Sequence, residues 1–240
     1  MTTLCFDFGN TRLKAAVFLK GELHEEITLT DGNINTIQHL IDTYTPTKTI
    51  LSSVIHHNID IENLLAKQSS FHKLSTDTKI NFTIAVGKKE TIGADRLALV
   101  AAASAQFSGK NNLIIGLGSC ITYNFINQYN QFLGGAISPG LDMRFKSMHD
   151  YTAKLPLIEA DWNFPLIGYD TKTNLQSGVI MGIACEIEGI IEKYSAKYDN
   201  FNVVLTGGNS LYFASQLKKK IFADANFLFK GLYALSELNN

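Results

Sequence analysis

The sequence predicts an α/β fold with two similar lobes, each a mixed sheet covered by helices, around a central cleft. Strand-like and helix-like segments alternate along the chain, which is typical of sheets with helical crossovers. A pattern of apolar strand, small-residue turn and second strand occurs twice, and its turns, at Gly9 and Gly118, lie 109 residues apart. This spacing indicates an internal duplication. The 240 residues suffice for two lobes with their own cores, which we expect to span residues 1–108 and 109–240.

The first lobe opens with a predicted hairpin. Two apolar runs, Leu4–Phe8 and Ala15–Phe18, flank a turn with Gly9 and Asn10, residues that tight turns favour. Further along, apolar residues recur at helical spacing or form short β-prone runs. The other elements predicted here are a strand at 22–28, a helix at 34–44, a strand at 48–53, a helix around 59–65, a β-prone segment at 71–74 and an alanine-rich helix at 97–107.

The second lobe repeats the alternation of strands and helices. Its predicted elements are two strands within 112–126, a strand at 132–138, a helix at 141–149, an irregular stretch at 152–171, a long helix at 175–198, a strand from 202, a short strand at 226–229 and a helix from 232. Gly178 and Gly182 would let another helix backbone approach the long helix closely, either in a dimer or within one lobe.

Charge and composition exclude several classes of function. With 21 basic and 22 acidic residues, no overall field attracts nucleic acid or an anionic membrane. No apolar stretch approaches the roughly 18 residues of a membrane span, and the start of the chain lacks a signal-peptide pattern. Cys5, Cys120 and Cys185 lack CxxC spacing and are expected to be buried free thiols. We therefore expect a cytoplasmic protein with small-molecule partners, no nucleic acid and no membrane.

The turn after the first strand is a candidate phosphate site. Gly9 lets the backbone approach a bulky group closely. Asn10, Thr11 and nearby backbone N–H groups would donate hydrogen bonds to phosphate oxygens, and Lys14 would add a positive charge. Asp7, at the end of the strand, would hold a divalent metal through its carboxylate. The alternative interpretation is an ordinary surface hairpin in which Lys14 is solvated.

A second candidate site precedes the alanine-rich helix. The segment Gly93–Arg96 places Asp95 at the start of the helix and beside a guanidinium. Both features favour the ionised carboxylate, which a proton acceptor requires. The alternative interpretation is that Asp95 only complements the helix dipole.

Five short motifs are each weak alone, but their order is specific. They are Asp-x-Gly-Asn-Thr-x-x-Lys at Asp7–Lys14, Gly-x-Asp-Arg at Gly93–Arg96, Gly-Ser-x-x-Thr at Gly118–Thr122, Gly-Gly-x-Ile-x-Pro-Gly at Gly134–Gly140, and Thr-Gly-Gly at Thr206–Gly208. In this order they resemble the type III pantothenate kinases, and the resemblance extends from residue 4 to about residue 235.

The resemblance implies a fold of the actin-like ATPase type, a ribonuclease H-like duplication shared with sugar kinases and Hsp70. It also implies a homodimer that transfers the γ-phosphoryl group of ATP to the terminal hydroxyl of pantothenate, at the start of coenzyme A synthesis. Mg²⁺ would be held through Asp7, K⁺ or NH₄⁺ would lie near the ATP site, and Asp95 would be the general base. By position, the phosphate-binding residues would be Asp7, Gly9, Asn10, Thr11, Lys14, Gly118, Ser119 and Thr122. The pantothenate-binding residues would be Gly93, Ala94, Asp95, Arg96 and, across the dimer interface, Thr171.

Three positions depart from the family pattern. Gly116 replaces an aspartate associated with the monovalent cation, Asn124 stands where a second aspartate is common, and Val86 stands where a tyrosine often contacts pantothenate. These departures leave two further functions open. One is a weakly active or non-catalytic relative that acts as a binding or regulatory protein, like the transcription accessory proteins of this fold. The other is a kinase for a sugar or another small hydroxylated substrate.

Overall fold

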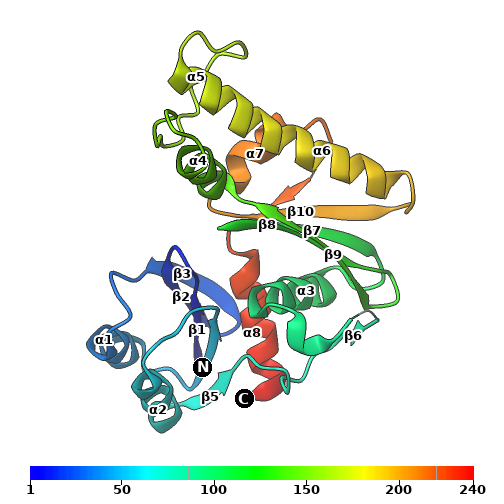
Figure 1. Cartoon of the computed structure of the whole chain (residues 1–240). Coiled ribbons are helices and arrows are strands. Elements are labelled where there is room, and N and C mark those ends of the chain that lie inside the picture. The colour runs from blue at the N-terminus through cyan, green and yellow to red at the C-terminus, as the bar shows by residue number, and fades with distance from the viewer. Residues whose placement is uncertain (86, 220) are drawn as a thin grey trace. The chain divides into compact units, whose positions relative to one another are not determined.

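The computed structural model describes residues 1–85, 87–219 and 221–240 and confirms the α/β class with two mixed sheets (Figure 1). Most of the predicted strands and helices occur, several with the predicted bounds. Those up to residue 106 are β1 (Thr2–Phe8), β2 (Leu13–Leu19), β3 (Glu22–Thr28), α1 (Ile34–Tyr44), β4 (Lys48–Ser53), α2 (Ile59–Gln68), β5 (Ser70–Lys73), β6 (Thr83–Ile84), η1 (Lys89–Thr91) and α3 (Ala94–Gln106). The others are β7 (Asn111–Leu117), β8 (Cys120–Ile126), β9 (Gln131–Pro139), α4 (Leu141–Asp150), α5 (Thr171–Gln176), η2 (Ser177–Met181), α6 (Gly182–Ser195), β10 (Phe201–Gly207), α7 (Ser210–Gln216), β11 (Phe222–Ala223) and α8 (Phe227–Asn239).

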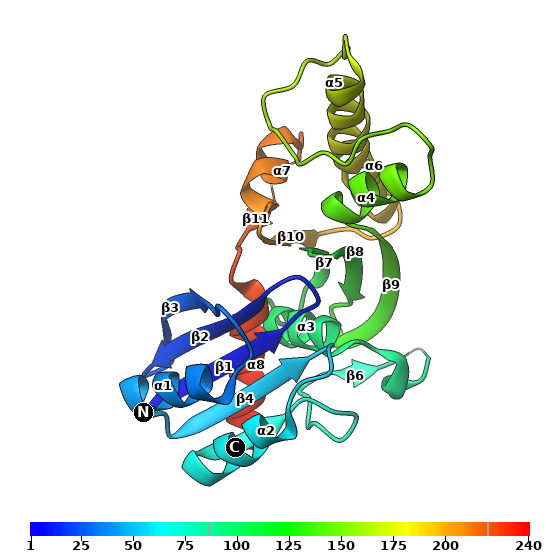
Figure 2. The same cartoon turned by 60° about the vertical axis from the view of Figure 1, so that its left-hand side comes forward.

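The first sheet has the strand order β3-β2-β1-β4-β5 (Figure 2). β1 is antiparallel to β2, as the predicted hairpin requires, and parallel to β4, which follows the crossover through α1. In this register Asp7 lies opposite Lys14 on β2 and opposite Ser52 on β4. The three side chains therefore form one row across neighbouring strands, near the carboxyl ends of β1 and β4.

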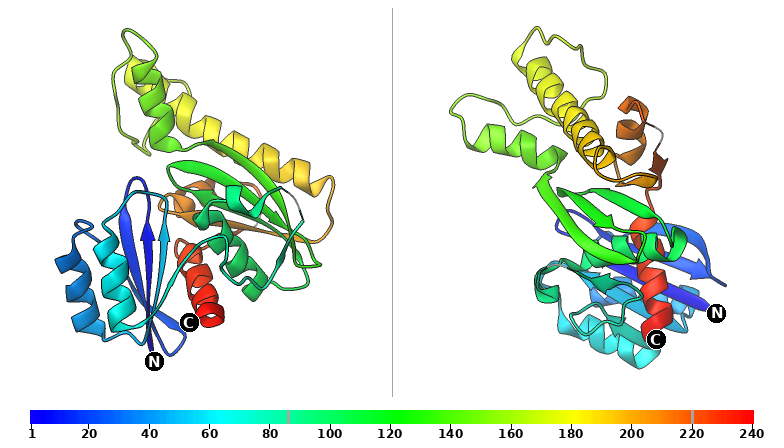
Figure 3. Two further views of the ribbon diagram at one scale, coloured as in Figure 1. Left: turned by 60° about the horizontal axis from the view of Figure 1, so that its bottom comes forward. Right: turned by 90° about the vertical axis from the view of Figure 1, so that its right-hand side faces the viewer.

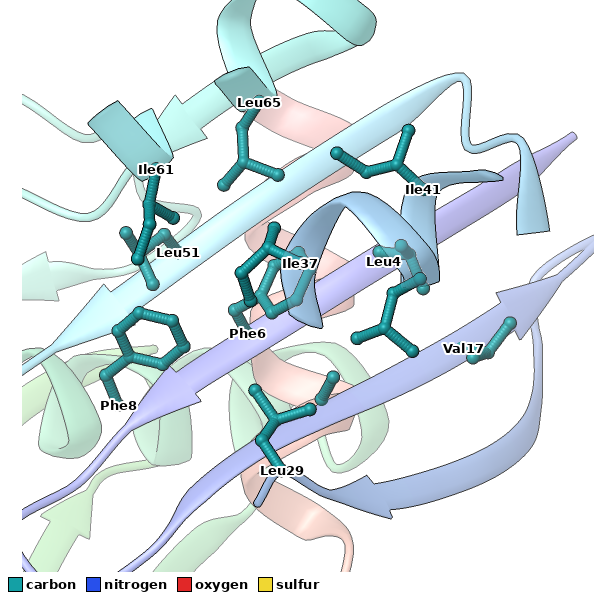
Figure 4. Packing of buried hydrophobic residues seen from close by; sticks show 12 residues of the cluster. Leu4, Phe6, Phe8, Val17, Leu29, Ile37, Ile41, Leu51, Ile61 and Leu65 are labelled. Carbon is teal, nitrogen blue, oxygen red and sulfur yellow. The ribbon is translucent and has the colours of Figure 1, made fainter. Parts of the chain in front are cut away.

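The core of this sheet is a cluster of aliphatic and aromatic side chains on the face covered by α1 and α2 (Figure 4). Strand residues such as Leu4, Phe6 and Phe8 alternate along β1 and pack against Ile37 of α1 and Ile61 of α2, all of which are buried. Helix α8 lies on the opposite face of the sheet (Figure 3, left). Each helix thus buries its apolar stripe against the sheet, and this packing supplies most of the stability of the helix.

The second sheet has the strand order β11-β10-β7-β8-β9-β6. β10 is parallel to β7, in the register that places Gly207 opposite Leu117. Helices α4, α6 and α7 lie on one side of these strands (Figure 1). The turns after β7 and β10 therefore lie at the same edge of the sheet, because parallel strands end together.

The chain divides into two compact units. The first contains Met1–Gly109, Ile126–Gly134 and Asn226–Asn240, and the second contains Lys110–Phe125 and Gly135–Ala225. Each predicted lobe is continuous in sequence. The first unit, by contrast, also includes Ile126–Gly134 and the C-terminal helix, which come from later in the chain. The physical reason is packing, since α8 contacts α3, β1 and β4, and β6 pairs with the start of β9.

Two predicted elements were wrong in detail. Residues 226–229, predicted as a short strand, begin α8 instead, since Phe227, Gly231 and Leu235 are buried at helical spacing. The long helix predicted at 175–198 starts earlier, at Thr171, and contains the π-helical segment η2 before it ends at Ser195. Its early start follows from a capping box formed by Asp170.

The small residues of this helix do not lie against a neighbouring backbone within the described chain. A Cβ atom at Gly178 or Gly182 would meet no atom within 4 Å. Close packing inside one lobe therefore does not explain them.

The cysteine prediction also needs correction, because Cys5 is buried but Cys185 is exposed. In the part of the chain that the structure describes, none of the helices has the length and apolar character that crossing a membrane requires.

Replacing Gly231 with Ala tests the packing of α8 on α3. The added Cβ would lie 1.8 Å from the backbone oxygen of Ala98, so the helices must separate. We expect urea denaturation to show a free energy of unfolding that is lower by roughly 1–3 kcal/mol. The value should lie at the upper end of this range, because a backbone oxygen cannot rotate away as a side chain can. The matched control is Gly189→Ala in α6, where a Cβ meets nothing within 4 Å. That variant should gain about 0.5–1 kcal/mol from helix propensity. Equal stabilities of the two variants would contradict the packing described here.

Candidate active site

The turn between β1 and β2 is short and closed by one backbone hydrogen bond. The amide nitrogen of Gly9 donates to the carbonyl oxygen of Arg12 at 3.1 Å. A Cβ on Gly9 would lie 3.2 Å from that oxygen, so glycine suits the tight turn. Asn10 and Thr11 are exposed at its tip. The turn therefore presents polar side chains to solvent immediately after Asp7.

Two carboxylates influence each other in the first unit. Burial, and next the negative charge of Asp95, raise the pKa of Asp7 from 3.8 to about 6. Ser52 and Lys14 act in the opposite direction. Since Asp7 and Asp95 come from positions 88 residues apart in the sequence, the fold brings together two of the groups predicted to act in one reaction. A half-buried carboxyl with a pKa near 6 is typical of functional sites.

Asp95 occupies the first turn of α3, directly above its N-cap residue Gly93. A Cβ on Gly93 would lie 2.5 Å from Asp95 Oδ1. The carboxylate thus folds back over the beginning of the helix, where the helix dipole favours negative charge. Gly93 is needed here for space, because any larger residue would displace the carboxylate.

Arg96 follows Asp95 and is half-buried. Its guanidinium carbon lies 5.7 Å from the ring centroid of Phe132, within cation–π range. Burial lowers the pKa of Arg96, and the charge of Asp95 acts against this shift. The ring and the carboxylate together orient the guanidinium beside Asp95.

Lys14 is not a free phosphate ligand in this structure. Its ammonium forms an ion pair with Glu26 on β3, and both side chains are mostly buried. Lys14 nevertheless lowers the pKa of Asp7, so its charge acts at the end of β1. A phosphate that bound here would compete with Glu26 for the ammonium.

In the second unit, the Gly118–Ser119 turn is supported by Gly140, which ends the Gly134–Gly140 motif directly after β9. Gly140 donates its amide hydrogen to the carbonyl oxygen of Ser119 at 3.1 Å. A Cβ on Gly140 would lie 2.3 Å from the carbonyl oxygen of Gly118, so the two backbones touch. The Gly118–Thr122 and Gly134–Gly140 motifs therefore form one structure.

The Thr-Gly-Gly turn contacts the backbone directly before Gly118. Gly207 has a φ of +103°, and a Cβ there would lie 2.2 Å from the carbonyl oxygen of Leu117. A cavity of about 10 Å³, the size of one water molecule, lies beside the Gly118 turn. It is lined by Leu117, Gly118, Ile121, Leu141, Ile183, Asn209 and Phe213. Residues of three of the five sequence motifs, among them Gly118, Gly140 and Gly207, thus meet within the second unit.

Some predicted residues lie away from these turns. Thr122 is buried on β8, and its Oγ1 accepts a hydrogen bond from Asn124 Nδ2 at 3.2 Å. Asn124 also donates to the carbonyl oxygen of Ile114, so it is part of the sheet interior. Thr171 is exposed at the start of α5. The prediction for Val86 lies outside the described residues.

Three groupings were missed by reasoning from the sequence. One is Ser52, whose position beside Asp7 follows only from the parallel pairing of β1 and β4. Another is a chain in which His57 contacts Ser53 Oγ at 3.0 Å and Glu62 Oε1 at 2.9 Å, and Glu62 also pairs with Lys73. The third is Glu186, which binds three side chains: Tyr123, Ser138 and Arg144. No sequence motif links the members of these groupings, because tertiary contacts join them.

The chain is similar to known proteins over its full length. A family model described as type III pantothenate kinase matches residues 3–193. The type III pantothenate kinase of Christiangramia forsetii is 41% identical over 238 residues, covering 98% of each chain. That of Bacteroides fragilis is 37% identical over 241 residues, covering 99% of this chain and 98% of the relative.

Solved structures share the fold at lower identity. A Baf family protein from Campylobacter jejuni, named for a proposed role as a transcriptional activator, has a TM-score of 0.62 at 23% identity and covers 98% of both chains. A glucokinase from an Antarctic psychrotroph has a TM-score of 0.54 at 10% identity and covers 99% of both. These likenesses show the fold alone, and they confirm the predicted fold class. The family match and the full-length relatives, by contrast, show that this chain belongs to the type III pantothenate kinase family.

Proposed function

We propose that this chain phosphorylates pantothenate with ATP, giving 4′-phosphopantothenate, the first intermediate on the way to coenzyme A. The observation that carries this proposal is the full-length similarity to pantothenate kinases together with retention of Asp7 and Asp95 in one electrostatically coupled pair. The reaction needs a proton acceptor, groups that bind phosphate and positive charge near the γ-phosphoryl group. The chain has residues suited to each of these tasks.

Asp95 is the proposed general base. Its carboxylate accepts the proton of the pantothenate hydroxyl while the oxygen bonds to the γ-phosphorus and the bond to ADP breaks. Gly93 leaves room for this carboxylate, and Ala94 and Arg96 complete the pantothenate-binding segment. The guanidinium held against Phe132 is suited to a polar group of the acceptor.

The phosphate groups are assigned to the small-residue turns. Gly9, Asn10, Thr11 and Lys14 are proposed to bind ATP phosphates in the first unit, with Lys14 exchanging Glu26 for a phosphate oxygen. In the second unit this role falls to Gly118 and Ser119, with Thr122 supporting the strand behind them. Backbone amides in such turns bind anions without a large cationic patch.

The residues present fit Mg²⁺. This ion prefers oxygen ligands and usually binds through one or two carboxylates plus substrate phosphates, retaining several waters. Asp7 supplies a carboxylate for such a site. Residues 1–85, 87–219 and 221–240 contain no cluster of three or more His, Cys, Asp or Glu side chains suited to a metal. When bound, the ion neutralises charge on the transferring phosphoryl group. Asp7 would hold it in position.

An assay with ATP and pantothenate tests the proposed function. ADP release is followed by a coupled enzyme reaction, and 4′-phosphopantothenate is identified by mass spectrometry. The assay is run with potassium and with tetramethylammonium, since Gly116 supplies no carboxylate for a monovalent cation. A sugar panel serves as the substrate control. Absence of pantothenate turnover above an Asp95→Asn variant would remove the proposal.

We also propose a homodimer in which Thr171 contacts pantothenate bound by the other copy. The stretch before α5 carries large apolar side chains in solvent: Tyr151, Leu166, Ile167 and Tyr169 are 89%, 73%, 84% and 81% exposed. So many exposed apolar residues in one segment mark an interaction surface. The open positions Gly178 and Gly182 lie just beyond it in the sequence.

Replacing Ile167 with Asp should therefore weaken the dimer, because a charge would be buried in an apolar interface. Light scattering after size exclusion is expected to show a monomer, with a raised KM for pantothenate. Ile59→Asp is the matched control, since Ile59 is 60% exposed in α2 of the first unit. A wild-type protein that is monomeric at the concentration of the assay would disprove the dimer.

A further inference from the structure

Ser52 has an unusual environment for a hydroxyl group. It lies on β4 and is completely buried. Among the residues that the structure describes, its Oγ has no hydrogen-bond partner of normal geometry. Buried polar atoms are nearly always hydrogen-bonded in native proteins, so each exception requires an explanation.

The carboxylate of Asp7 belongs to the residue opposite Ser52 on the neighbouring strand. The parallel register of β1 and β4 places Ser52 directly opposite Asp7, and the antiparallel register of β1 and β2 places Lys14 on the other side. Side chains opposite each other on neighbouring strands have their Cβ atoms about 5 Å apart. Lys14 is already paired with Glu26, which leaves the Ser52 hydroxyl beside the carboxylate. That hydroxyl also lowers the pKa of Asp7 as a hydrogen-bonding side chain does, so it faces the carboxylate, although no hydrogen bond of normal geometry joins the two.

Carboxylates that bind metals are themselves hydrogen-bonded as a rule. Such outer partners orient the carboxylate and fix the oxygen that faces the metal. A serine hydroxyl can supply this bond, because its hydrogen rotates about the Cβ–Oγ axis and can turn toward an oxygen of the carboxylate. Ser52 has no competing partner among the described residues.

We propose that Ser52 is a positioning residue that holds the Asp7 carboxylate for the divalent metal of the phosphoryl transfer. This inference rests on the proposed function, since it concerns the metal that accompanies ATP. The Ser52 hydroxyl, which has no hydrogen bond of normal geometry among the described residues, then completes its bond to the carboxylate when the ionised carboxylate binds the metal. A hydroxyl retained only for packing would be replaceable by alanine without consequence for the metal.

The experiment compares Ser52→Ala with wild type in the full-length protein. Mn²⁺ is the probe, and its affinity is measured by electron paramagnetic resonance in the presence of a non-hydrolysable ATP analogue. We expect about 10-fold or more weaker Mn²⁺ binding, as is usual for loss of an outer-shell partner. The melting temperature of the metal-free variant should equal or exceed that of wild type, since the substitution removes an unsatisfied buried hydroxyl.

Ser104→Ala is the matched control. Ser104 is also a buried serine of the first unit without a hydrogen-bond partner among the described residues, but it lies within α3 and is not paired with a carboxylate. It should leave Mn²⁺ affinity unchanged. The role of Ser52 would be overturned if the Mn²⁺ affinity of Ser52→Ala stayed within about twofold of wild type, since the usual loss of affinity is about 10-fold or more. That result would leave the kinase proposal intact. A melting temperature lowered in proportion to the loss of binding would also overturn the role of Ser52. A wild-type protein that neither binds Mn²⁺ with nucleotide nor phosphorylates pantothenate would overturn both proposals.

Discussion

Replacing Asp95 with Asn is expected to lower kcat for pantothenate phosphorylation by roughly 10²–10⁴-fold, the usual contribution of a general base. Asn keeps the size of the side chain and the space above Gly93, but it cannot accept the hydroxyl proton. Calorimetry should show that ATP binding is largely retained, because the base acts on the acceptor alcohol. The measurements are kcat and KM for both substrates at saturating Mg²⁺.

A matched variant separates this role from that of a helix-capping charge. Asp60 lies in the first turn of α2, as Asp95 does in α3, and is exposed. If both residues only complement helix dipoles, Asp60→Asn and Asp95→Asn should each cost about 0.3–1 kcal/mol of stability and leave kcat alone. We expect that result for Asp60 only. An Asp95→Asn variant with wild-type kcat would disprove the assignment of the base.

Replacing Asp7 with Asn should abolish most of the activity while making the metal-free protein more stable at high pH. The activity loss should exceed the roughly 10–100-fold that removal of an outer-shell partner of a metal costs. The stability effect follows from the raised pKa of Asp7, about 6 in the folded protein against 3.8 ordinarily. Folding thus favours the protonated carboxyl, so Asp7 stabilises the fold below about pH 4 and this contribution is lost as the pH rises through 6.

The test is the melting temperature of both proteins without metal at pH 5 and pH 8. Asn cannot ionise, so the advantage of Asp7→Asn over wild type should be larger at pH 8 than at pH 5. In the wild-type enzyme, kcat/KM for ATP should also fall below about pH 6, where Asp7 becomes protonated. A difference in melting temperature that does not change with pH would contradict the raised pKa.

Local patterns predicted a large part of this structure. The hairpin, α1 and β4 depend on apolar periodicity and turn residues, all of which act within a few residues. Where tertiary contacts decided, the predictions were less accurate. Residues 226–229 are β-prone in composition but form helix, because α8 buries Phe227 and Gly231 against α3. The π-helical segment η2 likewise has no local signal.

The candidate site shows the same division. Asp7, Gly93 and Asp95 were predicted from motifs, because the chemistry of phosphate and proton transfer demands particular residue types at short spacing. The role of Ser52 could not be found in this way, since a serine in a buried strand has no distinguishing local pattern. Its position depends on the register between β1 and β4, which are separated by an entire crossover.

By itself, the sequence determined the α/β class, the order of the motifs and the family to which they belong, since each depends on short-range pattern. Only the tertiary structure decided that Asp95 raises the pKa of Asp7, that Glu26 holds Lys14 and that Ser52 lies opposite Asp7. The physical reason is that Coulomb interactions and burial depend on distance in space, and strand pairing brings together residues far apart in the chain.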